Sequence, residues 1–120
     1  MRSAENTDNK PRNPDLDFTN KQGKSTLEVH FYKHGKSFGF ATADEYLKSA
    51  RWFLEKPATA TIQHFISAAG TYFRYDTATN EFAIINEFGG ISTYFKPNTK
   101  KYYWLEQIKL YKPKQAGGKK

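Results

Sequence analysis

The second half of the chain constrains the fold most, because short apolar runs alternate there with polar turns. The runs TYFRYD (71–76) and EFAIIN (81–86) flank the polar sequence DTATN, and this arrangement predicts a β-hairpin. The turn EFGG leads into ISTYFKP (91–97), and the looser alternation of ATIQHFIS (60–67) precedes the hairpin. Successive hairpins of this kind predict an antiparallel sheet.

The segment TADEYLKSARWFLEKP (42–57) predicts a helix. Thr42 followed by Glu45 forms a capping box, acidic residues in the first turn suit the helix dipole, and Pro57 ends the segment. One face of this helix would be buried and would carry Tyr46, Leu47, Ala50, Phe53 and Leu54.

A further helix is expected to run from residue 27 to about Gly39, although Gly35 would also serve as its end. One face would carry large groups at positions i, i+4, i+7 and i+11, namely Leu27, Phe31, His34 and Phe38. His30 would lie beside this face.

Helices followed by hairpins predict an α+β domain in which N-terminal helices pack on a twisted antiparallel sheet of four to five strands. The segment KYYWLEQIKLY (101–111) fits either a strand or a short helix. The domain is expected to span residues 26–111. Residues 1–25 are polar enough to predict a flexible linker or tail, and residues 112–120 a basic C-terminal tail.

The charge of the chain indicates an anionic partner. Its 120 residues carry a formal net charge of +7, which suits nucleic acid, an acidic protein or an anionic membrane surface. The chain has no cysteine, which excludes disulfides and thiolate chemistry. Its apolar runs fall well short of the roughly 18 residues of a membrane span, so any crossing of a membrane would depend on another part or partner. Among the anionic partners, nucleic acid and an acidic protein are expected, and a membrane is not.

Two histidines four residues apart raise the question of a metal site. His30 and His34 have the spacing of a zinc pair on a helix, but a zinc site needs a third ligand. His64 is the other histidine, and no acidic residue lies between His30 and His34. We therefore expect no metal and no cofactor. The sequence GKSFG (35–39) has the GxSxG spacing, but it falls within the expected helix and not on a strand-to-helix turn, so it does not form the elbow of a serine hydrolase.

The remaining possibility is a basic site that cuts RNA without a metal. Such a site needs a base for the 2′-hydroxyl, an acid for the leaving 5′-oxygen, and cations or hydrogen-bond donors around the phosphorus. Histidine suits the proton transfer because its ordinary pKa is about 6.5. The candidate cations are Lys33, Lys36 and Arg74, and the candidate hydrogen-bond donors are Thr93, Tyr94 and Tyr103.

Each candidate also has an ordinary structural interpretation. His34 and His30 would pack in the core, lysines would lie on a solvated helix face, and Arg74 would pair across strands. Tyr94, Tyr102 and Tyr103 would either fill the core or stack on bases. Two alternatives to a nuclease therefore stay open: a non-catalytic basic RNA-binding module, and an interaction domain for an acidic protein.

Three blocks in order resemble one family of nucleases. They are KHGKSFGF (33–40), GTYFRYDTATNEFAII (70–85) and GGISTYFKP (89–97). Together they resemble the nuclease domain of colicin D and the toxin tips of bacterial polymorphic toxins, including contact-dependent growth-inhibition proteins. The resemblance covers roughly residues 27–110. It implies the wider barnase, EndoU, colicin and RelE-like fold, in which helices pack on an antiparallel sheet.

The resemblance implies roles for several residues. His34 would be catalytic, with Lys33 and Lys36 beside it. Thr93, two residues before Phe95, would face the scissile phosphate, and Ser92 before Tyr94 is the alternative. Alternation along a strand would place these two hydroxyls on opposite faces, so one of them would serve, and Thr93 is preferred.

Residues and resemblance together give one expected site. Its catalytic residues would be His34, Thr93, Lys36, Arg74 and Tyr103. Its RNA-binding residues would be Lys33, His30, Tyr94, Phe95 and Lys96.

The resemblance also implies a biological role. The domain would be a metal-independent ribonuclease toxin, used in competition between bacteria, that cleaves tRNA and leaves a 2′,3′-cyclic phosphate. It would act as a monomer in the target-cell cytoplasm, after delivery as the C-terminal part of a larger secreted or cell-surface toxin. An acidic cognate immunity protein would neutralise it, and a translation elongation factor of the target cell is a further expected partner.

Overall fold

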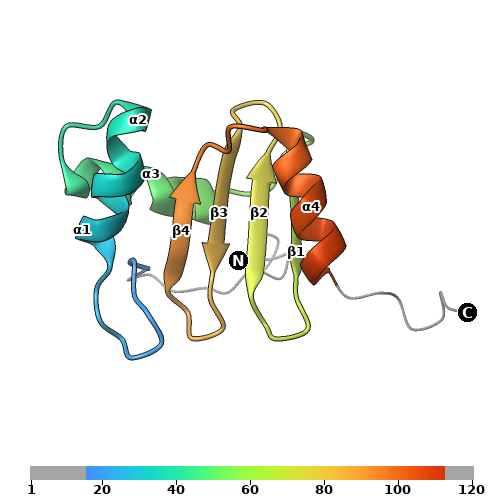
Figure 1. Ribbon diagram of the computed structural model, residues 1–120, viewed down its shortest axis with the longest axis horizontal. Coiled ribbons are helices and arrows are strands. Elements are labelled where there is room, and N and C mark those ends of the chain that lie inside the picture. The colour runs from blue at the N-terminus through green and yellow to red at the C-terminus, as the bar shows by residue number, and fades with distance from the viewer. Residues whose placement is uncertain (1–15, 113–120) are drawn as a thin grey trace, which may run out of the picture.

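Four antiparallel strands form the centre of the fold in the computed structural model, which describes residues 16–112 (Figure 1). The strands are β1 (Ile62–Ile66), β2 (Tyr72–Asp76), β3 (Glu81–Ile85) and β4 (Ile91–Phe95). They pair in the order β1-β2-β3-β4, each with its neighbour in the chain. The predicted α+β class and the antiparallel sheet are confirmed.

Short polar side chains close the hairpin turns. Asp76 Oδ1 accepts a hydrogen bond from the Ala78 N–H (2.8 Å) at the turn after β2. At the turn after β3, Asn86 Oδ1 accepts from the N–H groups of Phe88 (2.9 Å) and Gly90 (3.1 Å). These bonds satisfy backbone donors that the strand ladders leave unpaired, which is the usual function of Asp and Asn in turns.

Helices cover both faces of the sheet (Figure 1). Helix α3 (Ala43–Glu55) packs on the face that carries Tyr72, and helix α4 (Lys101–Tyr111) packs on the face that carries Phe73. All five residues of β2 are buried, since this strand is covered from both sides. The segment that fitted either a strand or a helix is therefore the helix α4. None of the helices in the described residues is long and apolar enough to span a membrane.

Helix α3 begins and packs as the sequence predicted. Thr42 Oγ1 accepts from the Glu45 N–H (3.2 Å), and Glu45 Oε1 accepts from the Ala41 N–H (3.0 Å). The five residues of the expected stripe are all buried, namely Tyr46, Leu47, Ala50, Phe53 and Leu54.

The predicted helix before α3 is present but contains a π-helical turn. Its parts are α1 (Leu27–His30), the π turn η2 (Phe31–Gly35) and α2 (Lys36–Phe38), and we call the whole helix 27–38. Gly39 ends it in the left-handed conformation, with φ of 93°. Gly35 does not end the helix. A Cβ on Gly35 would lie 2.2 Å from Phe31 Cδ1, so the Phe31 ring packs directly on this glycine.

Part of the predicted N-terminal linker belongs to the domain, so the expected boundary at residue 26 is wrong. Leu16 and Phe18 are fully buried in the core, and the Ile91 N–H donates to the Asp17 carbonyl oxygen (2.8 Å). We call residues 16–25 the strap. Its composition is polar, but two large side chains are enough to anchor it. The remaining parts of the two predicted tails, residues 1–15 and 113–120, lie outside the described residues.

Whether the strap is part of the folded domain can be tested by substituting two phenylalanines, one buried and one exposed. Phe18→Ala removes a buried ring and should lower the free energy of unfolding by about 3–5 kcal/mol. Phe88 is 61% exposed, and Phe88→Ala should change it by no more than about 0.5 kcal/mol. Urea unfolding followed by tryptophan fluorescence measures both. Equal stabilities of the two variants would place the strap outside the folded domain.

Candidate active site

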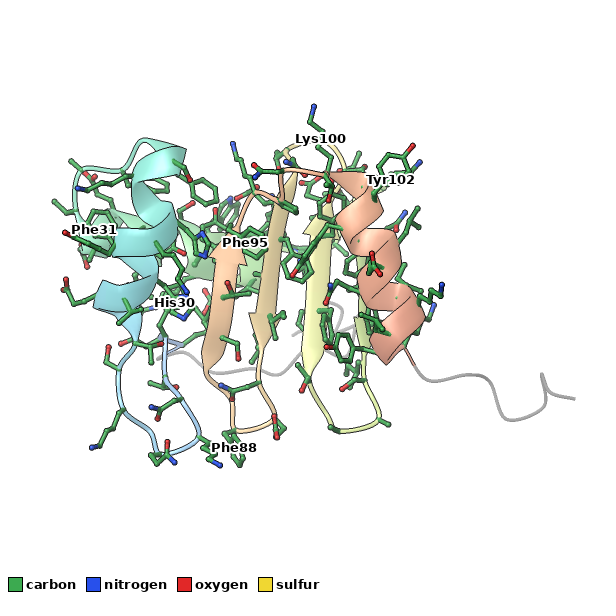
Figure 2. All side chains as sticks on the ribbon, viewed as in Figure 1. His30, Phe31, Phe88, Phe95, Lys100 and Tyr102 are labelled. Atoms are coloured by element: carbon green, nitrogen blue, oxygen red, sulfur yellow. The ribbon has the colours of Figure 1, made fainter. Side chains whose placement is uncertain are left out.

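The candidate site lies on the α4 side of the sheet, at the edge strand β4. Thr93 pairs with Ile84 and Phe95 pairs with Phe82, so these side chains share a face. Ile84 and Phe95 pack against the cluster of buried residues around Trp104. Figure 2 shows Phe95 between helix 27–38 and α4. Thr93 and Phe95 are only partly buried, so this part of the face is accessible.

His34 stacks on this face. Its ring centroid lies 4.9 Å from that of Phe95, with 21° between the two ring planes. Tyr103 of α4 meets Phe95 edge-on from the other side at 5.5 Å. The structure therefore brings together three residues that the sequence proposed, His34, Phe95 and Tyr103, from three separate elements, and Thr93 shares a face of β4 with Phe95.

His30 continues the stack along helix 27–38. Its ring lies 6.3 Å from His34 and 5.2 Å from Phe18 of the strap. The Nδ1 atom of His30 is buried and has no hydrogen-bond partner among residues 16–112. A protonated ring would place an unpaired N–H there, which is costly.

Burial lowers the pKa of both histidines below the usual 6.5. For His34, burial is the larger cause, and the positive charge of Lys33 adds to it. For His30, burial is the largest cause of the lowered pKa, and electrostatic repulsion from His34 and then from Lys33 adds to it. Both rings are therefore neutral at pH 7, and a neutral imidazole can accept a proton. Burial also raises the pKa of Tyr103, so its hydroxyl keeps its proton and can donate a hydrogen bond.

The lysines of the expected site are all exposed but lie in different places. Lys33 is close enough to His34 to affect its pKa. Lys96 lies over the ring of Phe38, 5.2 Å from its centroid. Lys36 lies 5.4 Å from the centroid of Tyr32, a ring that is 80% exposed. The structure thus places Lys36 on the solvent side of the helix.

Arg74 is not part of the site, and its predicted catalytic role is wrong. Its side chain is fully buried on the α3 side of the sheet, opposite Phe95. The guanidinium donates to the Tyr72 hydroxyl (2.8 Å) and to the Lys56 carbonyl oxygen (2.5 Å). Alternation along β2 places the side chain of Arg74 on the opposite face of the sheet from those of Phe73 and Tyr75. It does not indicate which of the two faces carries the candidate site.

Tyr94 is also excluded, which corrects its predicted RNA-binding role. It is fully buried, and its hydroxyl bonds to Glu81 and to Ser49 Oγ (2.7 Å). Its carbonyl oxygen accepts from the Tyr46 hydroxyl. Burial raises the pKa of Tyr94 far above its ordinary value. This tyrosine joins α3 to the edge strand.

A β-bulge in β4 removes the basis on which alternation was used to choose between the hydroxyls of Ser92 and Thr93. Ile91 pairs with Ile85 and Thr93 pairs with Ile84, so Ser92 is the extra residue on β4. Strict alternation, which would place Ser92 and Thr93 on opposite faces, does not hold across the bulge. Both side chains are partly buried.

Sequence reasoning missed a pocket beside the histidines. Its volume is about 320 Å³, and it lies between the strap, helix 27–38 and the turn from β3 to β4. The lining includes Thr19, Lys21, His30, Phe88 and Ser92. The one available signal was the apolar Phe88 in an otherwise polar turn, and it becomes meaningful only once the strap is known to fold over this turn.

Among residues 16–112, no group of three or more His, Cys, Asp or Glu side chains is placed to hold a metal ion.

The sequence is matched by no protein-family model and by no curated protein.

The lowered pKa of His34 can be tested through Lys33. NMR titration of the ring protons should give midpoints below 6.5 for His30 and His34. Lys33→Ala should raise the His34 midpoint toward 6.5 without reaching it, because burial is the larger cause. Lys36→Ala is the matched control, since Lys36 lies over Tyr32, and it should leave the midpoint unchanged. A larger shift in the control would contradict this electrostatic arrangement.

Proposed function

We propose that this domain is a metal-independent endoribonuclease in which His34 transfers the proton. The main support is the position of His34, a partly exposed neutral imidazole that stacks on Phe95. The Phe95 ring also contacts Tyr103, and its side chain shares a face of the sheet with Thr93. A binding surface needs no proton acceptor, whereas cleavage of RNA without a metal needs a base for the 2′-hydroxyl and hydrogen-bond donors or cations around the phosphorus. The net charge of +7 suits the polyanionic substrate.

The chemistry proceeds by attack within the RNA strand. His34 takes the proton of the 2′-hydroxyl, the 2′-oxygen bonds to phosphorus, and the bond to the 5′-oxygen breaks. This leaves a 2′,3′-cyclic phosphate, and solvent supplies the proton taken up by the leaving 5′-oxygen. Thr93 and Tyr103 donate hydrogen bonds to the phosphoryl oxygens. Lys33 and Lys96 contribute positive charge nearby.

The resemblance to colicin D and related toxin tips supports the same proposal. Its first block contributes His34 and its third contributes Thr93 and Phe95, and these blocks meet in space at the stacked rings. On this basis we propose a barnase, EndoU, colicin and RelE-like nuclease that cleaves tRNA, is delivered by a larger toxin, and acts in the target-cell cytoplasm. An acidic immunity protein would bind the cationic site, and its association would weaken with salt.

A non-catalytic RNA-binding module is the second candidate. The ring of Tyr32 is 80% exposed, and Lys36 lies 5.4 Å from its centroid. Such rings stack on bases without cleaving them. The two candidates differ in what the removal of His34 does.

His34→Ala should lower the rate of RNA cleavage by roughly 10²–10⁴-fold, the usual contribution of general acid–base catalysis. RNA affinity should change little, because phosphate contacts from lysines supply most of it. The measurement follows cleavage of total RNA in excess EDTA, with the product ends identified chemically. His64→Ala is the matched control, since His64 stacks on Tyr72 on the α3 side of the sheet, and it should cut at the parent rate.

Each variant must first have the melting curve of the parent. A folded His34→Ala variant that cuts at the parent rate would remove the catalytic assignment. A mobility shift without cuts would favour the binding module, and neither binding nor cutting would favour a protein-interaction domain. Dependence on added Mg²⁺, or 5′-phosphate products, would exclude the proposed mechanism.

A further inference from the structure

The pocket beside His30 has the size and position of a subsite for the substrate strand. Its volume of about 320 Å³ is near the lower limit of small-molecule sites, which span about 300–1,000 Å³. A pocket of this size suits a single nucleoside better than a larger ligand. We call it the His30 pocket.

The His30 pocket adjoins the candidate active site at two points. His30 lines the pocket, and its ring lies 6.3 Å from that of His34. Ser92 also lines the pocket and directly precedes Thr93 on β4. An RNA strand with its phosphate between His34 and Thr93 would therefore pass its next nucleotide to this pocket.

The side chains around the pocket are of the kinds that bind nucleotides. Phe88 is 61% exposed and offers a ring face to a base. Lys21 is exposed and offers a positive charge to a phosphate. Thr19, Thr26 and Ser92 bring hydroxyl groups, which both donate and accept hydrogen bonds.

The walls of the pocket are held in place by contacts of the strap. The Asn86 side-chain amide donates to the Thr19 carbonyl oxygen (3.0 Å), which joins the β3–β4 turn to the strap. Gly90 permits this approach, because a Cβ there would lie 2.0 Å from Thr19 Oγ1 and 2.6 Å from the Thr19 carbonyl oxygen. A pocket with fixed walls loses little entropy when a ligand binds.

We infer that the His30 pocket binds one nucleoside of the RNA strand, next to the scissile phosphate, with Phe88 stacked on its base. This inference rests on the proposed ribonuclease function. It makes Phe88 and the pocket hydroxyls determinants of which base the enzyme accepts beside the cut.

The binding step is tested with the four ribonucleoside 5′-monophosphates, each titrated into the ¹⁵N-labelled full chain. Amide shifts should concentrate in residues 19–30 and 86–92. Phe88→Ala should weaken binding on the order of 10-fold, as expected for loss of base stacking. Tyr102→Ala is the matched control, because it removes a 77% exposed ring from α4, and binding should not change. Shifts centred elsewhere, or equal effects of the two variants, would overturn the inference.

Cleavage of RNA of mixed sequence separates this inference from the proposed function. Phe88→Ala should change the base preference at one position beside the cut, whereas Tyr102→Ala should not. Cleavage by Phe88→Ala with the parent's preference would overturn the pocket inference and leave the ribonuclease proposal intact. Mononucleotide binding in the pocket by a chain that does not cut RNA would have the opposite meaning: the ribonuclease proposal would fail, and the pocket would stand as a nucleotide site.

Discussion

The arrangement of the whole N-terminal half depends on one buried tyrosine, Tyr46 of α3. Its hydroxyl donates to the carbonyl oxygen of Tyr94 on β4, and its ring contacts Phe18 of the strap at 5.2 Å between centroids. The same ring is surrounded by three aromatic side chains from helix 27–38 and the loop after it: Phe31, Phe38 and Phe40. Strap, helix and edge strand thus share a single contact. Because His34 is carried by that helix and Phe95 by that strand, this contact helps to hold the two rings in their stack.

The sequence was most informative where one local pattern decides the structure. The capping pair of α3, its buried stripe and the β2–β3 hairpin follow from spacing alone, since a helix face and a turn are defined by neighbours in the chain. The π turn at Phe31–Gly35 has no comparable signal. It depends on the Phe31 ring packing against the backbone of Gly35, which is a tertiary fit.

The candidate site was predicted only in part, for a related reason. The rings of His34, Phe95 and Tyr103 lie in contact and Thr93 shares the face of Phe95, but Arg74 and Tyr94 lie in the interior. Period-2 alternation separates the residues of a strand into two sets without saying which set faces the active side. That choice depends on where α3 and α4 pack, and the bulge at Ser92 then interrupts the alternation itself. The pocket beside His30 depends on the strap, whose polar composition concealed two anchoring side chains.

The hydrogen bond from Ile91 to Asp17 has a consequence for the behaviour of the protein in solution. Strand β4 is an edge of the sheet, and an edge strand exposes N–H and C=O groups that can pair with a second molecule. The strap occupies one of these positions, because the Ile91 N–H donates to the Asp17 carbonyl oxygen. Phe18, next in the chain, is buried in the core behind it. A fragment that begins at residue 26 would therefore expose both an unpaired strand edge and apolar surface, and would be prone to self-association.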